Sequence, residues 1–361
     1  MYLNFASQCI VYIEDSFFEM VSFIKASNWK YHIIFKSTQY DIKISAAEEN
    51  SFVPDRILHP NYEASGAYFV IKDSKGERLG FDFSVFGVAS AKIIVERGYD
   101  LSFAKEILFD LVRVVLMHKG VACLHASSFV SNDLGNMVIG WEGIGKSAIM
   151  LKKVYSGDKF LSDDRTFLDT GGMIHPIYSN VKQYSGEFPF FRELLKKVSF
   201  KERLVIKINI WVHGQIKRTK KPRNRLLWQK FLRLLRKLGF YEIEIPLDTL
   251  SLGENKGYTL SVVFMLQQIP KNMVSKIHSL DTLRDEIMNK MLLTTKFDDS
   301  GLAKLYLVFK YLFPQKKNEA MEEYDAWIID ILKKGLNNCN LHHAAIPHNF
   351  SIIDIIKSIN E

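Results

Sequence analysis

The residues of this sequence with the clearest chemistry are glycines, a lysine and a serine that follow a short apolar stretch. Residues 137–140 are apolar or small, as in a strand, and residues 147–155 have the apolar spacing of a helix. Between them, the phosphate-binding pattern G-x-x-x-x-G-K-[ST] is matched at every specified position. We therefore predict that this loop binds a nucleotide through Gly140, Gly143, Ile144, Gly145, Lys146, Ser147 and Ala148.

The spacing of this motif has a physical reason. Glycines let the loop turn tightly, so that successive backbone N–H groups point at phosphate oxygens. The helix that begins near Gly145 adds the positive end of its dipole. Lys146 is expected to reach the β- and γ-phosphates, and the Ser147 hydroxyl is expected to ligate Mg²⁺. The alternative is a glycine-rich turn that binds nothing.

Two adjacent carboxylates, Asp163 and Asp164, follow the short apolar stretch 159–162. Phosphoryl transfer needs a second acid on the Mg²⁺ side of the site. Neighbouring residues on a strand point to opposite faces, so both acids serve one site only where the strand ends and bends. One aspartate is expected to hold Mg²⁺ with Ser147, and the other to accept a proton from an attacking hydroxyl. The sequence leaves open which aspartate has which role. It also leaves open that the two aspartates lie on a simple surface turn and have no function.

A hairpin is expected to lead into the phosphate-binding loop. Residues 121–130 have the composition of a strand and residues 131–136 that of a tight turn, which implies a partly antiparallel sheet. His125 lies in the first strand of this hairpin. A lone histidine in an apolar strand is more often a core residue with satisfied hydrogen bonds than a catalytic one.

Together, these motifs resemble the HPr kinase/phosphorylase family, whose P-loop core is similar to that of phosphoenolpyruvate carboxykinase. The resemblance rests on the strand with His125, the hairpin, the loop with Lys146 and Ser147, and the Asp163-Asp164-Arg165 run. It implies that His125, Lys146, Asp163 and Asp164 are catalytic and that Ser147, Asp163 and Asp164 surround Mg²⁺. It also implies ATP as the phosphoryl donor and a serine hydroxyl as the acceptor.

The sequence departs from this family at two places. Trp141 stands directly after the first loop glycine, where HPr kinases usually carry an acidic residue, and Glu142 comes next. The family's Glu-x-Arg-Gly-[Leu/Ile]-Gly segment is missing. The chain therefore looks more like HPr-kinase-related proteins, some of which phosphorylate a precursor peptide. A P-loop hydrolase, a nucleotide-sensing regulator and a kinase of a small hydroxyl-bearing molecule remain alternatives.

Composition indicates a globular α/β protein with two or three domains in its 361 residues. We expect a small N-terminal α/β domain at 1–98, a mixed-sheet P-loop kinase core at 99–270 with a basic insertion at 216–238, and a mainly helical part at 271–361. Cys9, Cys123 and Cys339 are too few for a disulfide framework, which favours a cytoplasmic protein. The N-terminus lacks the basic region of a signal peptide, and no apolar run approaches the length of a spanning helix.

Hydrophobic periodicity predicts the remaining elements. Strands are expected at 10–13, 31–35, 68–71, 80–83, 93–95, 203–212, 241–246, 258–267 and 341–346. Helices are expected at 16–25, 102–118, 188–200, 277–293, 301–313, 319–334 and 352–359. A hairpin turn is expected at 74–76, an exposed loop at 46–60 and a turn at Gly171-Gly172.

The run 217–237 is rich in Lys and Arg and contains no acidic residue. Together with the net charge of +8, it is compatible with an acidic peptide or protein substrate or with an anionic membrane surface, although a surface helix with its charges in water is the simpler interpretation. Aromatic residues are not interleaved with these charges, which argues against nucleic acid. Cys339, His342, His343 and His348 fit no standard zinc spacing. The oligomeric state, including a homo-oligomer, stays open.

Overall fold

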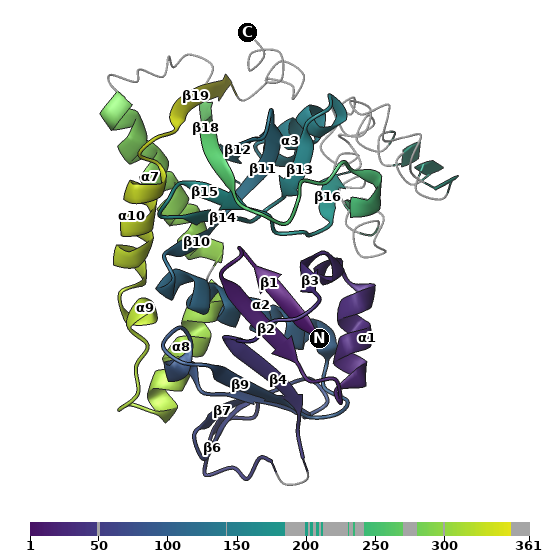
Figure 1. The fold of residues 1–361 in the computed structure, drawn as a ribbon, viewed down its shortest axis with the longest axis vertical. Coiled ribbons are helices and arrows are strands. Elements are labelled where there is room, and N and C mark those ends of the chain that lie inside the picture. The colour runs from purple at the N-terminus through teal and green to yellow at the C-terminus, as the bar shows by residue number, and fades with distance from the viewer. Residues whose placement is uncertain are drawn as a thin grey trace.

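Two mixed β-sheets, with helices packed between and beside them, make up the structure, a computed structural model (Figure 1). It describes residues 1–48, 51–141, 143–184, 199–200, 203–204, 207–208, 211, 230, 234, 242–269, 280–298 and 300–347. The predicted α/β class with a mixed sheet is therefore confirmed. Among the described residues, no helix has both the length and the apolar character needed to cross a bilayer.

The first sheet is built from the N-terminal part of the chain. Among the described residues it has nine strands, in the spatial order β3 (Ile33–Ile34), β1 (Tyr2–Phe5), β2 (Cys9–Ile13), β4 (Ile42–Ala46), β9 (Ala91–Val95), β8 (Arg78–Phe81), β7 (Tyr68–Lys72), β6 (Tyr62–Ser65) and β5 (Arg56–His59). Strand β2 alternates between buried and half-buried residues, as expected for a strand with one face on the core. The hairpin turn predicted at 74–76 joins β7 to β8 and is confirmed.

The second sheet carries the phosphate-binding motif. Its spatial order is β10 (Val121–Leu124), β14 (Thr166–Asp169), β15 (Met173–His175), β18 (Tyr258–Ile269), β12 (Leu134–Ile139), β11 (Ala126–Ser131) and β13 (Lys159–Ser162), with β19 (Asn340–Pro347) paired to β18. Strands β12, β18 and β19 run parallel, whereas β11 and β12 are antiparallel. The predicted hairpin into the motif and the partly antiparallel sheet are thus confirmed. A separate ribbon pairs β16 (Val181–Tyr184) with β17 (Glu242–Ile245).

The second half of β12, residues 137–139, is apolar because both of its faces are covered. Met137 and Ile139 pack with α7 (Leu280–Asp298) and α10 (Tyr324–Gly335). Val138, between them, packs with α3 (Lys146–Tyr155) on the other face. A strand that is buried on both faces has no polar alternation, which is why this stretch is continuously apolar in sequence.

Helix α2 (Leu101–His118) connects the two sheets, as the predicted helix at 102–118 anticipated. Asp100 caps it by accepting hydrogen bonds from the backbone N–H groups of Ser102 (2.9 Å) and Phe103 (3.3 Å). Its second half is buried all round, because it packs against β2 of the first sheet and β10 of the second. The orientation of α2 therefore decides which part of the N-terminal region faces the phosphate-binding loop.

The C-terminal helices divide between the two sheets. Helix α8 (Ser300–Leu312) packs into the core of the first sheet, whereas α7 and α10 pack on the second. The short helix α9 (Glu319–Glu322) and α10 replace the single helix predicted at 319–334, because the chain turns at Glu323. The predicted domain boundaries stay predictions.

Buried Asn318 holds several of these elements together. Its Nδ2 donates to the carbonyl oxygens of Phe83 (3.2 Å) and Phe86 (2.9 Å). Its Oδ1 accepts from His118 Nε2 (3.0 Å), at the end of α2, and from the Met321 backbone N–H (3.3 Å). One side chain thus ties the first sheet, α2 and α9 to each other.

Several expected elements are different in the structure. The predicted strand 121–130 is broken at His125, since β10 pairs with β14 and β11 pairs with β12. The segment predicted as strand 31–35 is divided: its first two residues end the short helix η1 (Asn28–His32), and the next two form strand β3, which pairs with β1. Part of the predicted loop 46–60 is strand β5, which pairs with β6.

Residues 203–212 are not a strand where the structure describes them. Residues 203–204, 207–208 and 211 are helical. Leu204, Ile208 and Trp211 are exposed on this segment, and their spacing of four and three residues suits a helix, so the alternation seen in sequence was the wrong period. Three predicted segments lie wholly or mostly outside the described residues. Of the helix predicted at 188–200, only 199–200 are described, and of the basic segment 216–238, only Lys230 and Leu234. None of the closing helix predicted at 352–359 is described.

Candidate functional site

The phosphate-binding motif forms a turn between β12 and α3. Gly140 has φ = 156°, and a Cβ added there would lie 2.8 Å from Ile144 Cγ2 and 3.0 Å from the Leu266 carbonyl oxygen. Gly145 has φ = 106° and immediately precedes the helix. Both positions therefore need glycine, one for space and both for backbone conformation. The loop ends at the N-terminus of α3, where backbone N–H groups favour an anion.

Lys146 is the buried cation of the site, with only 7% of its surface exposed. Its Nζ donates to the carbonyl oxygens of Gly140 (2.9 Å) and Trp141 (3.4 Å). The same Nζ lies 2.8 Å from Nε2 of His125. Because a lysine ammonium has donors only, His125 Nε2 accepts this bond and the ring proton is on Nδ1. His125 is thus part of the loop's polar network, at the break between β10 and β11.

Asp163 is the buried carboxylate of the pair, with 5% of its surface exposed just after β13. Its Oδ1 accepts a hydrogen bond from Ser127 Oγ at 2.7 Å, and its carboxylate also accepts one from the Ser147 hydroxyl. Burial raises the pKa of Asp163, although these two hydrogen bonds act in the opposite direction. A buried carboxylate and a motif serine hydroxyl therefore converge at the start of α3.

Asp164 differs from its neighbour in every respect. Its side chain is 68% exposed, and its backbone adopts a left-handed conformation with φ = 67°. Its Oδ1 lies 3.4 Å from His125 Nδ1, the nitrogen that carries the ring proton. The bend after β13 lets both carboxylates point into the same region, as the sequence argument required. One is buried beside Ser147 and the other faces solvent beside His125.

A groove of about 710 Å³ opens beside the two carboxylates. One wall comes from the second sheet and its turns, with Asp163, Asp164 and Tyr178. The other comes from the N-terminal region, where η1 and α2 contribute Trp29 and Phe109. Its volume lies within the range of about 300–1,000 Å³ that is usual for ligand sites. The exposed carboxylate therefore lines a groove that is large enough for a small ligand.

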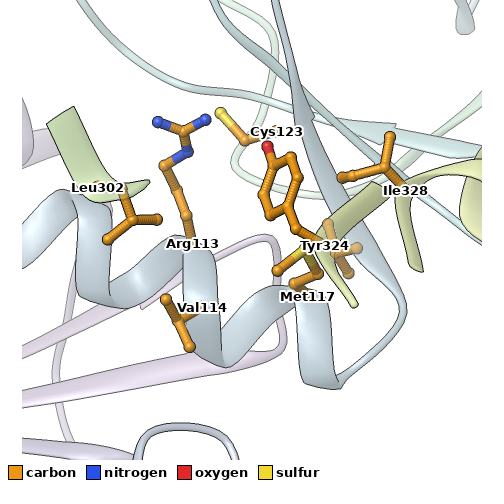
Figure 2. Close-up of a pocket in the computed structure, with 8 residues that line it drawn as sticks. Arg113, Val114, Met117, Cys123, Leu302, Tyr324 and Ile328 are labelled. Atoms are coloured by element: carbon orange, nitrogen blue, oxygen red, sulfur yellow. The ribbon is translucent and has the colours of Figure 1, made fainter. Parts of the chain in front are cut away.

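A second cavity, shown in Figure 2, is not a candidate site. It lies between α2, β10 and the C-terminal helices, beside Arg113, Cys123 and Tyr324. Its volume is about 10 Å³, which holds a single water at most. Arg113 is buried here and forms an ion pair with Asp110 at 3.4 Å. This cavity is a small gap in the packing where α2 meets β10.

The structure brings the predicted catalytic residues together at one end of the second sheet. His125, Lys146, Ser147, Asp163 and Asp164 are linked through the contacts described above. The loop residues complete the turn: the Ile144 N–H donates to the Trp141 carbonyl oxygen at 3.3 Å, Gly143 has φ = 75° with open space around it, and Ala148 is buried in α3.

The two adjacent histidines of β19 have partners away from the site. His343 Nε2 lies 2.8 Å from Gln267 Oε1, and His342 packs against the Phe264 ring. His348 and most of the basic segment lie outside the described residues. No group of three or more His, Cys, Asp or Glu in the described part of the chain is arranged to hold a metal ion.

Mg²⁺ with ATP is nevertheless compatible with the residues present. Mg²⁺ keeps several waters and binds through one or two protein oxygens plus substrate phosphates, so it needs no all-protein cluster. The Ser147 hydroxyl and the Asp163 carboxylate supply that oxygen pair. The raised pKa of Asp163 reflects a buried negative charge whose cost a cation would offset.

Two further residues lie at the site and are absent from the residues predicted from the sequence. Ser127, the donor to Asp163, lies in β11, two residues after the break at His125. Lys290, from α7, lies 5.6 Å from the ring centroid of Trp141, and burial lowers its pKa. Nothing local in the sequence connects α7 to the loop, because only packing on the second sheet brings them together.

Comparison with known proteins adds no relative, since no protein-family model matches the chain and no curated protein sequence matches it.

Proposed function

We propose that the protein is an ATP-dependent phosphotransferase that moves the γ-phosphate of ATP to a hydroxyl group, most plausibly a serine of a peptide or protein. The observation that carries the proposal is the set of contacts around the loop. Lys146 donates a hydrogen bond to His125, and Ser147 donates one to Asp163. The other ring nitrogen of His125 lies 3.4 Å from Asp164. A loop that only turns the chain has no need of a buried lysine, an oriented histidine and two distinct carboxylates.

Nucleotide binding falls to the loop and the start of α3. The backbone N–H groups and the helix N-terminus hold the phosphates, and Lys146 exchanges its bonds to the loop carbonyls for phosphate oxygens. His125, which now accepts a hydrogen bond from Lys146, keeps that ammonium oriented toward the phosphates. This arrangement positions the reacting group, which is the main part of catalysis in phosphoryl transfer.

The two aspartates take different roles because their surroundings differ. Ser147 and buried Asp163 hold Mg²⁺, which supplies charge neutralisation at the phosphates when it is bound. Exposed Asp164 accepts the proton of the acceptor hydroxyl, and His125 Nδ1 lies 3.4 Å from that carboxylate. The acceptor oxygen then bonds to the γ-phosphorus, the bond to the bridging oxygen breaks, and ADP leaves.

The groove beside Asp164 supports an acceptor other than water. Water alone needs no space of about 710 Å³ lined by aromatic and charged side chains. The groove also reaches the N-terminal region, which gives that part of the chain a role in binding the second substrate. Neither a hydrolase nor a nucleotide sensor requires a groove with this lining, because neither binds an acceptor other than water.

The proposal is tested with γ-labelled ATP and Mg²⁺ on the wild type, Lys146→Ala and Asp163→Asn. The acceptors are none, HPr, free serine and a small set of serine-containing peptides. Label on an acceptor that both substitutions abolish supports a kinase and reveals its substrate class. Label released only as free phosphate, whatever acceptor is present, replaces the proposal with a hydrolase.

A further inference from the structure

One face of α2 forms a wall of the groove beside the carboxylates. The face comprises Ser102, Lys105, Glu106, Phe109 and Asp110, whose spacing is that of a single helix stripe. Across the groove, Arg165 follows directly after the two aspartates. The groove therefore carries two cations, one from each wall, in addition to its acidic groups.

Both cations lie on aromatic rings. Lys105 Nζ is 5.1 Å from the ring centroid of buried Trp29, and Arg165 Cζ is 5.4 Å from that of Phe109. Within the described part of the chain, neither side chain makes an ion pair. The aromatic faces hold each cation in place without neutralising it.

The acidic groups of α2 do not cancel these cations. Asp110 makes its ion pair with Arg113 at 3.4 Å, and burial raises the pKa of Asp110 although the charges of Arg113 and Arg165 act in the opposite direction. Glu106 is exposed at the edge of the groove. Burial lowers the pKa of Lys105, and the nearby charge of Glu106 offsets this effect only in part, so the ammonium is partly removed from water without full compensation. A partly desolvated cation of this kind favours an anionic ligand.

We propose that Lys105 and Arg165 select an acceptor that carries a carboxylate close to its reacting hydroxyl. The carboxylate lies between the two cations, and the hydroxyl reaches Asp164, the sequence neighbour of Arg165. The guanidinium of arginine suits this role because its fork of N–H donors matches a carboxylate. The inference rests on the proposed phosphotransfer, and it names the chemical class of the acceptor. Such a carboxylate belongs either to an acidic residue next to a serine in a peptide or to a free hydroxy acid.

The test measures equilibrium binding, so that it does not depend on turnover. The probe is a fluorescein-labelled peptide, Gly-Glu-Ser-Glu-Gly, with blocked termini, followed by anisotropy in the presence of Mg²⁺ and ADP. A Gly-Gln-Ser-Gln-Gly peptide is the uncharged comparison, and unlabelled glycerate is the free hydroxy acid competitor. The variants are Lys105→Met and Arg165→Gln, with exposed Lys92→Met and Arg97→Gln as matched controls away from the groove.

The expected result is selective binding of the acidic ligand. The glutamine peptide, and each groove variant with the acidic peptide, should bind about tenfold more weakly, since each loses one charge-assisted contact. The two control variants should bind as the wild type does. Displacement by glycerate at lower concentrations than by unlabelled acidic peptide identifies a free hydroxy acid as the source of the carboxylate, and the reverse order identifies a peptide.

Equal affinity for the two peptides, equal losses in groove and control variants, or no binding of either the acidic peptide or glycerate would overturn the inference. Affinity for ADP is measured in the same samples, so that failure of the acceptor class can be distinguished from failure of the proposed function. A protein that binds Mg²⁺ and ADP but shows no charge selection contradicts only the acceptor class. A protein that binds no nucleotide contradicts the proposed function itself.

Discussion

Replacement of Asp163 by asparagine should stabilise the fold while it abolishes phosphotransfer. The Asp163 side chain is 5% exposed, and its carboxylate accepts hydrogen bonds from Ser127 at 2.7 Å and from Ser147. Asparagine has nearly the same shape and keeps an oxygen acceptor for these hydroxyls, but it carries no charge. The substitution therefore separates the cost of the buried charge from the packing of the side chain.

Two opposing effects set the magnitude. Loss of the charge removes a desolvation cost that is several kcal/mol for a buried ion. It also weakens two charge-assisted hydrogen bonds, by about 1 kcal/mol each. Burial is the largest influence on the pKa of Asp163 and the net shift is upward, so the desolvation cost is the larger effect. We expect Asp163→Asn to raise the free energy of unfolding by about 1–2 kcal/mol without Mg²⁺ or nucleotide, which raises Tm by a few degrees.

The dependence on pH has a definite sign. A carboxyl group whose pKa is raised in the folded protein takes up its proton there before the unfolded chain does. The advantage of Asp163→Asn over the wild type is therefore full above the folded pKa, and it shrinks as the pH falls toward 3.8, the ordinary pKa of an aspartate. All other titratable groups are the same in the two proteins. Their contributions therefore cancel when the two free energies of unfolding are subtracted at each pH.

Denaturant unfolding of both proteins across this pH range, without Mg²⁺ or nucleotide, tests the reasoning. Asp164→Asn is the matched control, because Asp164 is 68% exposed and asparagine tolerates its left-handed backbone. Its stability should stay within about 0.5 kcal/mol of the wild type. Destabilisation of Asp163→Asn at neutral pH, or an advantage that grows as the pH falls, would refute the account of Asp163.

Three further predictions follow from the geometry. His125→Gln should lower the transfer rate about a hundredfold with little change in the KM for ATP, as measured by label transfer, because it removes the group that orients Lys146 and Asp164; an equal rise in that KM would contradict this. Gly140→Ala should cost about 1–3 kcal/mol in denaturant unfolding and abolish ATP binding, since its Cβ would lie 2.8 Å from Ile144 Cγ2; unchanged ATP affinity would contradict it. Asn318→Ala should lower stability by about 2–4 kcal/mol in the same assay through the loss of four hydrogen bonds, and a loss below 1 kcal/mol would show that Asn318 does not tie the elements together.

Local signals in the sequence predicted the elements that hold the motif. The hairpin into the loop is confirmed, with Asn132 and Asp133 both at positive φ, as a two-residue turn requires. Helix α2 begins within one residue of the predicted start because its apolar spacing is a local feature of the sequence. The strand break at His125 was missed, because an apolar run does not show that its two halves pair with different partners.

The second substrate region could not be predicted in the same way. The groove forms where α2 and η1 of the N-terminal region meet the turn after β13, and this meeting depends on packing between distant segments. Lys105 and Trp29 therefore gave no sign in sequence that they lie near Asp164. The residues with a fixed spacing inside one motif were accessible from sequence, whereas their partners across the groove needed the fold.

The most direct test of the central claim compares wild type with Asp164→Asn at saturating Mg²⁺ and γ-labelled ATP, in the presence of the serine-peptide set. Asp164 is the exposed carboxylate beside His125, so the variant should bind ATP and unfold as the wild type does. We predict that its rate of label transfer to the acceptor falls by about a hundredfold or more. Transfer at the wild-type rate by this variant, or no transfer to any acceptor by the wild type, would contradict a phosphotransferase that uses Asp164 as its base.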